Sequence, residues 1–489
     1  MPVDDLEADL FDYHTGYDVD SELYLNSSPQ GQWTSSLAPV VEAKFNKFDL
    51  SLLLLMWLLV FASSIRSFGR FPGALFLALN IFLAIKKPIN GLLVLVLLLF
   101  VPGSSLLIPR IFVVSTIIMT FGCFVRGDIL NLSFLNKMVF FAAVFVVFVG
   151  LTVFFARDVE STLRYLQDQA ESVILIILTF TAITTSKDLG ILLKWLSIAA
   201  ALSLLIGATH HFLGPSTAQY EIARSIQTEE ELRRAAAITL LGERVRLLWP
   251  GAEPNYFAAQ LIFPLAVSLG LFSSRTVVLR KTFWILISII IVFALLGTFS
   301  RSGYLAGFAL LLMFLWRRNL RALVPILAIV LVFFVLLSFV PVVGERIISI
   351  PVNIAIRGGT GRFYSFQKSF QLWLSSPVWG NGIGSVITSI GYVTHNTFLQ
   401  ILAELGVIGE ILFVSVIVAA IKSIKDGRKL YFDKSNPDVI LFGVILLGLI
   451  ATCLHLNTIT YQDPKVLWLL CGICGVFYTI RKQEVLGYS

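Results

Sequence analysis

The chain has 489 residues, of which 57% are hydrophobic and only 14% are charged, against roughly 25% charged residues in an ordinary soluble domain. This composition excludes a soluble globular protein and a disordered body, and four cysteines exclude a disulfide scaffold. The formal net charge of +7 is unevenly divided. Residues 1–43 hold nine Asp or Glu and no Lys or Arg, so the remaining chain holds 21 acidic residues and all 37 basic ones.

The domain organisation follows from this division. Residues 1–47 are predicted to be an acidic, flexible cytoplasmic tail, because the segment lacks the basic and apolar regions of a signal peptide. A docking segment for a basic partner is the alternative. Residues 48–482 are predicted to form one transmembrane body, and residues 483–489 a cytoplasmic C-terminus. The expected fold class is an all-α polytopic membrane protein.

Apolar runs separated by short charged or Pro, Gly and Asn breaks predict about 14 transmembrane helices. They lie at residues 48–65, 68–85, 88–102, 107–125, 135–156, 170–186, 189–213, 253–273, 281–299, 302–316, 322–340, 396–421, 437–456 and 464–480. The runs 88–102 and 302–316 are the shortest, and a re-entrant segment is the alternative for each.

The orientation follows from basic residues in the short connections, because Lys and Arg accumulate on the cytoplasmic side. Five basic clusters fall on one side of the 14-span arrangement, so both termini are expected to be cytoplasmic. The clusters are Lys86–Lys87, Arg275/Arg280/Lys281, Arg317/Arg318/Arg321, Lys422/Lys425/Arg428/Lys429 and Arg481–Lys482. Two long loops, residues 214–250 and 341–395, are then extracytoplasmic.

The outer side carries most of the polar side chains on which a function can depend. Transporters usually place ionisable residues near the middle of their spans, whereas nearly all charges here lie near a predicted span end. One outer cluster runs from Arg246 to Pro254 and Asn255, and Pro and Asn suit the start of a helix. A helix cap beside solvated arginines is the alternative.

A second cluster, Thr298 to Gly303, lies between two apolar runs with almost no loop. Ser300 precedes Arg301, whose charge is so close to hydrocarbon that it requires a partner or a bound anion. Snorkelling of the side chain to the interface is the alternative.

A third cluster surrounds Arg362 in the second long loop. The aromatic residues that follow it recur on one face of a helix, which predicts an amphipathic helix along the outer interface. They are Phe363, Phe366, Phe370 and Trp373. This helix is expected either to cover a lipid substrate as a lid or to pack on the spans.

A fourth cluster combines glycines with a histidine. Gly380, Gly382 and Gly384 permit a tight turn back to the membrane, which places His395 at the start of a span. A lone His in such a place is more often a hydrogen-bonded interfacial residue than a catalyst.

Arginines on the same face as His395 favour a catalytic role for this residue. Guanidinium groups pair bidentately with phosphate oxygens, and His is suited to take a proton near neutral pH. The combination suggests transfer chemistry with a phosphate or pyrophosphate leaving group and a hydroxyl nucleophile. No metal site is predicted, and the chain has no phosphate-binding loop or dinucleotide fingerprint.

The order of these motifs resembles that of the bacterial O-antigen ligase and polymerase superfamily. The resemblance covers roughly residues 240–412 and is most specific from Gly361 to Gly409. The matching residues are Arg246, Pro254, Asn255 and Ala258; Thr298, Ser300 and Arg301; Gly361, Arg362 and Trp373; Pro377, Gly380, Gly382 and Gly384; His395, Asn396, Phe398 and Leu399; and Glu404, Gly406 and Gly409.

The resemblance implies a GT-C-type glycosyltransferase of the bacterial inner membrane that works at the periplasmic face without a metal or other cofactor. Its donor would be an undecaprenyl-pyrophosphate-linked glycan, and its acceptor a lipid-linked glycan or lipid A-core. By motif, His395 corresponds to the essential His of the family. Arg246, Arg301 and Arg362 correspond to arginines that hold the pyrophosphate. The supporting motif residues are Asn255, Ser300, Asn396 and Glu404.

Three functions stay open at this point. The acidic tail and the number of predicted spans depart from the usual ligase pattern, which favours a polysaccharide polymerase. A ligase that passes glycan to lipid A-core is the second possibility. A small-solute, bicarbonate-like transporter is the third, because members resembling proposed bicarbonate transporters share this loop. Polysaccharide-assembly proteins are the expected protein partners.

Overall fold

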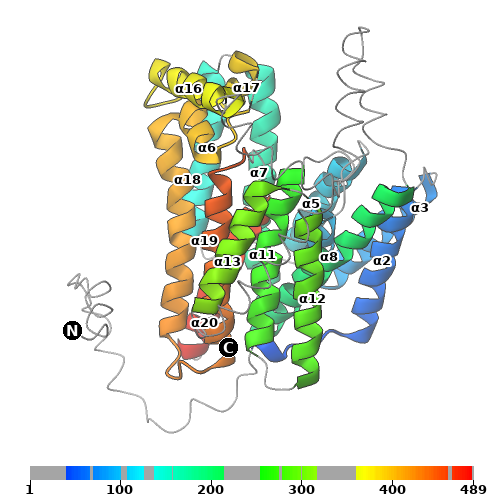
Figure 1. Cartoon of the computed structure of the whole chain (residues 1–489). Coiled ribbons are helices and arrows are strands. Elements are labelled where there is room, and N and C mark those ends of the chain that lie inside the picture. Colours follow the sequence, from blue (N-terminus) through cyan, green and yellow to red (C-terminus); the bar gives the residue numbers. More distant parts are fainter. Residues whose placement is uncertain are drawn as a thin grey trace, which may run out of the picture. The chain divides into compact units, whose positions relative to one another are not determined.

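The computed structural model describes residues 40–65, 70–100, 107–125, 137–156, 158–213, 254–274, 278–298, 300–316, 360–391, 393–460 and 465–486 (Figure 1). Every regular element in these ranges is a helix, which confirms the all-α class. The elements are η2 (Val40–Glu42), α2 (Lys47–Ile65), α3 (Arg70–Lys86), α4 (Pro88–Leu99), α5 (Leu107–Val125), α6 (Lys137–Leu151), η4 (Thr152–Phe155), α7 (Val159–Ala182), α8 (Ser186–Leu213), α11 (Pro254–Ser273), α12 (Val278–Gly297), α13 (Arg301–Trp316), α16 (Thr360–Ser375), α17 (Ser385–Ile390), α18 (Thr397–Lys429), α19 (Pro437–Leu456) and α20 (Lys465–Leu486).

Most of these helices coincide with predicted apolar runs, and α5 and α19 have the predicted bounds. Among the described residues, six helical segments are long and apolar enough to cross a membrane, as expected of a membrane protein. They are Lys137–Phe155, Ser186–Leu205, Asn255–Ser273, Leu279–Gly297, Thr397–Lys429 and Pro437–Leu456. The predicted number of 14 spans is not confirmed, and the run 322–340 lies outside the described residues.

Two predicted runs differ in their bounds from the helices observed there. The run 88–102 forms α4, whose 12 residues measure about 18 Å and cannot cross about 30 Å of hydrocarbon. Its residues from Ile89 to Leu99 are all buried in the protein. The run 170–186 belongs to α7, which begins much earlier because the side chain of Asp158 accepts a hydrogen bond from Ser161 N and caps the helix.

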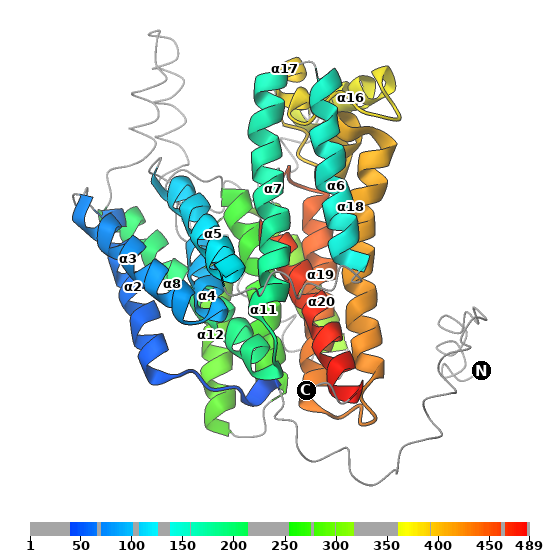
Figure 2. The same ribbon diagram turned by 180° about the vertical axis from the view of Figure 1, so that it is seen from behind.

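Helices α11 and α19 pack side by side near the centre of the bundle, and α12 and α13 flank them. Small residues allow this contact: a Cβ at Gly448 would lie 2.4 Å from the Cβ of Ala266. Close packing at small residues is the usual way in which helices associate in lipid. A neighbouring group of α6, α7, α18 and α20 packs together through its long faces (Figure 2).

Helices α16 and α17 lie across the same end of this second group, over α7 and α18, as both views show (Figures 1 and 2). The helix predicted in the second long loop is therefore present as α16. The remainder of that loop before Thr360 and the whole loop 214–250 lie outside the described residues.

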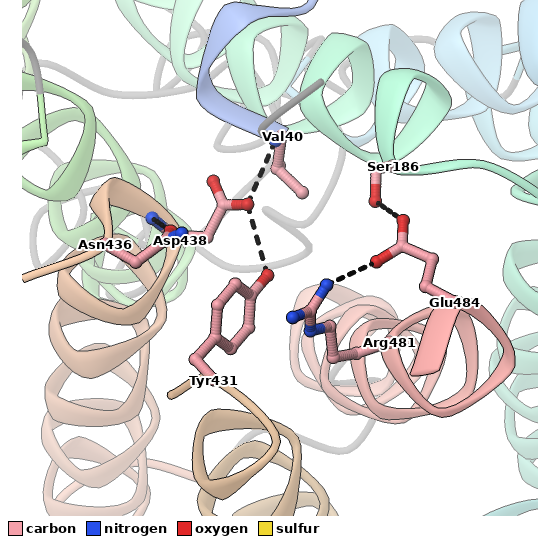
Figure 3. Close-up of polar contacts among 7 residues, drawn as sticks. All are labelled: Val40, Ser186, Tyr431, Asn436, Asp438, Arg481 and Glu484. Atoms are coloured by element: carbon pink, nitrogen blue, oxygen red, sulfur yellow. Dashed lines mark hydrogen bonds and ion pairs between the residues drawn. The ribbon is translucent and has the colours of Figure 1, made fainter. Parts of the chain in front are cut away.

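A polar network closes the opposite end of the bundle (Figure 3). The carboxylate of Asp438 accepts hydrogen bonds from the backbone N–H groups of Val40 and Val41, at 3.1 and 3.3 Å, and from the hydroxyl of Tyr431 at 3.2 Å. Burial raises the pKa of the Tyr431 hydroxyl, and the nearby Asp438 adds to this effect. Val40 and Val41 are buried, so the chain is attached to the bundle from η2 onward.

Candidate active site

His395 has an unusual backbone conformation. Its φ of 56° is the only positive value at a non-glycine residue in the described part of the chain, and such conformations concentrate at functional sites. The His395 N–H donates to Thr460 Oγ1 at 2.6 Å. The side chain of the next residue, Asn396, accepts a hydrogen bond from Leu399 N and caps α18. His395 is thus held where the turn after α19 meets the start of α18.

A second hydrogen bond attaches the turn after α19 to the start of α18. Thr397 Oγ1 donates to Ile459 O at 2.8 Å, and Thr458 N donates to His455 O at 2.8 Å. Both Thr397 and Thr460 are buried. The position of His395 therefore depends on the C-terminal end of α19.

Ser300 and Asn255 lie together at the start of two other helices. Ser300 Oγ donates to Asn255 Oδ1 at 2.7 Å and accepts from Gly303 N at 3.2 Å, so Ser300 caps α13. A Cβ at Gly303 would lie 2.6 Å from the Cβ of Ala258, which shows how closely α13 approaches α11 here. The hydrogen bond between Ser300 and Asn255 therefore joins the first two clusters of the sequence analysis directly.

A buried serine and histidine connect this helix junction to α19. Ser302 Oγ lies 3.3 Å from Ser300 Oγ and 3.2 Å from His455 Nε2. Because His455 also begins the turn that holds His395, a continuous bonded path runs from Asn255 to His395. Sequence reasoning missed Thr460. The polar Thr458 and Thr460, between two apolar runs, were the available signal.

Arg301 is the first residue of α13 and its side chain is exposed. No carboxylate in the described part of the chain forms an ion pair with it. A cation is normally unfavourable at a helix N-terminus, since the helix dipole is positive there. Helix and guanidinium together therefore favour a bound anion.

Arg362 lies in the first turn of α16 and is also exposed. The helix packs on α18. Its residues Ser365, Ser369 and Leu372 are buried, whereas Phe363 and Phe370 are exposed. Ser369 Oγ lies 2.9 Å from Thr394 Oγ1, so α16 is attached to the residue that precedes His395.

The glycine motif and the Glu404 motif interlock. Asn381 N and Gly382 N both donate to Glu404 O at 2.9 Å, and Val407 N donates to Pro377 O at 2.9 Å. These contacts require a break in α18 at Gly406, which has φ 67° and ψ −171°. The Glu404 carboxylate is buried and accepts from Val386 N at 3.3 Å and from Gln400 Nε2 at 3.0 Å.

The glycine loop is also fastened to α7. Thr162 Oγ1 donates to Ile383 O at 2.9 Å. One turn earlier, hydrogen bonds from the backbone and side chain of Ser161 hold the pKa of Asp158 below its usual value. The end of α7 that the sequence prediction omitted therefore supports the site. Arg246 lies outside the described residues.

Residues 286–414 match a family model described as O-antigen ligase. The resemblance to the O-antigen ligase and polymerase superfamily is confirmed. The matched O-antigen ligase segment contains Ser300, Arg301, Arg362, His395 and Glu404. A comparison with curated proteins finds no match. The family points to glycosyl transfer on lipid-linked glycans and gives no support to the transporter alternative.

Proposed function

We propose that the chain is an inverting, metal-independent glycosyltransferase of the bacterial inner membrane, most simply a polysaccharide or O-antigen polymerase. The observation that carries the proposal is the bonded path from the Asn255–Ser300 junction through His455 to the His395 turn. It holds the backbone of His395, whose imidazole could accept a proton, in the same framework as a helix N-terminus that bears an exposed arginine. The O-antigen ligase match over residues 286–414 supports the same chemistry.

In the proposed reaction, His395 accepts the proton of an acceptor sugar hydroxyl. The hydroxyl oxygen forms a bond to the anomeric carbon of the donor, whose bond to undecaprenyl pyrophosphate breaks with inversion. The pyrophosphate leaves with the bonding electrons, and Arg301, Arg362 and Arg246 stabilise its developing charge. The active site would face the periplasm and both termini the cytoplasm.

His395→Asn is the sharpest test of the proposed base. Asn tolerates a positive φ, so the turn is retained while the proton acceptor is lost. We expect kcat to fall by at least about 100-fold, the usual contribution of a general base. His14→Ala, which changes a His of the acidic tail, is the matched control and should leave the rate unchanged. A folded His395→Asn protein that still extends glycan chains would remove His395 from this role.

The acceptor is tested with purified protein and a lipid-linked repeat unit. Longer chains formed from the repeat unit alone indicate a polymerase. Product that forms only after lipid A-core is added indicates a ligase. The ligase is the second candidate, because the matched family model is described as O-antigen ligase. Absence of transfer in both mixtures would discard the proposed function.

A further inference from the structure

A small pocket lies beside the His395 turn, between α6, α7 and the first part of α18. Its polar lining residues are Gln169, Thr397, Gln400, Glu404 and Thr460. Phe145 and Phe413 form an apolar wall, with ring centroids 6.0 Å apart. Gln400 and Glu404 are each only 3% exposed, so this polarity is built into the interior of the protein.

The orientation of the Gln400 amide is fixed by Glu404. Its Nε2 donates to Glu404 Oε1 at 3.0 Å, and a carbonyl oxygen could not take this place beside a carboxylate. The amide oxygen Oε1 is buried and has no hydrogen-bond partner in the described part of the chain. A buried acceptor that lacks a partner is costly and marks a place where a donor belongs.

The chemistry of the lining selects the occupant. Gln400 Oε1 requires a hydrogen-bond donor, and the lining residues carry no positive charge that would hold an anion such as phosphate. The phenylalanine wall favours a neutral group with apolar carbon beside it. A sugar hydroxyl meets these three conditions.

The pocket also adjoins the proposed base. Thr460, which lines the pocket, accepts the hydrogen bond from His395 N. A sugar held by one hydroxyl in the pocket would therefore lie beside the turn that carries the imidazole.

We propose that this pocket is a specificity subsite that binds a hydroxyl of the acceptor sugar through Gln400. The inference rests on the proposed function, because it assigns the site to the acceptor rather than to the pyrophosphate. Gln400 is a binding residue in this proposal, and it takes no part in proton transfer.

Two variants test the subsite. Gln400→Met removes the amide at nearly constant length, and Ile401→Phe fills the pocket from its lining without removing a polar group. Gln367→Met, at an exposed position on α16, is the matched control. The probes are methyl glycosides of common hexopyranoses, whose binding to the detergent-solubilised full chain is measured by saturation-transfer NMR.

We expect at least one glycoside to bind the wild type and the Gln367→Met control equally. Both pocket variants should raise the Kd for this glycoside by about fivefold or more, the effect of losing one hydrogen bond. The same variants should raise the KM for the acceptor and leave the KM for the donor unchanged. Ile401→Phe keeps the test valid if Gln400→Met does not fold.

Equal glycoside affinity in the wild type and a folded pocket variant, or no glycoside binding at all, would overturn the subsite. This result is distinguishable from failure of the proposed function. Glycoside binding that depends on Gln400, in a protein that transfers no glycan, would discard the glycosyltransferase and the acceptor role, and would keep Gln400 as a sugar-binding residue.

Discussion

At the scale of single residues, the backbone of His395 shows how the candidate base is held in place. A non-glycine residue with φ 56° is strained, and it persists only when its surroundings hold it. Thr460 is one of these contacts, because its hydroxyl accepts the His395 N–H at 2.6 Å. Thr460 is therefore a positioning residue for His395.

Thr460→Val keeps the side-chain shape and removes this acceptor. We expect kcat to fall by about tenfold, since the part-buried His395 N–H loses its acceptor and such a loss costs about 1–1.5 kcal/mol. If Thr460 acts by positioning His395, kcat should fall and KM should stay unchanged. Initial rates and apparent melting temperatures of the two proteins provide the measurement.

Thr460→Ser is the matched control, because it keeps the hydroxyl and should retain most of the wild-type rate. Adding Thr460→Val to His395→Asn should cause no further loss, as both changes affect one function. Independent, multiplying losses would assign Thr460 a role that does not pass through His395.

At the scale of elements, the break in α18 joins two parts of the O-antigen ligase segment. Gly406 adopts φ and ψ values that only glycine populates readily. A Cβ there would lie 2.3 Å from Val378 O, and one at Gly380 would lie 2.2 Å from Glu404 O. The two glycines thus let the loop 377–384 pack directly on the broken helix.

Gly406→Ala should destabilise the protein by about 3 kcal/mol or more, because it adds a backbone clash to an unfavourable conformation. Gly391→Ala is the control, since Gly391 also has a positive φ but a Cβ there meets nothing within 4 Å. The control should cost only about 1–2 kcal/mol. Thermal unfolding in detergent compares the two, and equal melting temperatures would contradict the interlocked arrangement.

The sequence predicted individual helices well, since length and apolar content are local properties. It also proposed Asn255, Ser300 and His395 for one site. The structure joins Asn255 to Ser300 by a hydrogen bond and joins His395 to Thr460 by another. It did not reveal the break at Gly406 or the contact of Thr460 with His395. Both depend on segments distant in the chain, so neither has a local pattern.

The packing of α16 shows a second limit of sequence reasoning. Its spacing predicted the helix but left open which face contacts the protein. The small residues Ser365 and Ser369 face the protein, and aromatic residues such as Phe363 remain exposed. In a membrane protein, close packing selects small side chains for helix contacts, because lipid can cover the apolar ones.

At the scale of the whole molecule, the two ends of α19 have different tasks. Its C-terminal end carries His455 and the turn that holds His395, whereas its N-terminal end carries Asp438 (Figure 3). Asp438 accepts hydrogen bonds from the N–H groups of Val40 and Val41, so residues 40 and 41 of the segment predicted as a flexible tail are held on the bundle. The attachment of η2 is thereby separated from the site by the length of α19.

Asp438→Ala should release η2 and leave the site intact. The N–H groups of Val40 and Val41 would lose their acceptor, and with about 1 kcal/mol per hydrogen bond their amide exchange should accelerate by about tenfold or more. Tyr431→Phe is the control, because it removes one donor to Asp438 and leaves both backbone bonds. Hydrogen–deuterium exchange of the peptide covering residues 40–46 measures the effect. Equal exchange of this peptide in both variants would mean that Asp438 does not hold η2 on the bundle. Loss of glycan transfer in Asp438→Ala would mean that the two ends of α19 are coupled.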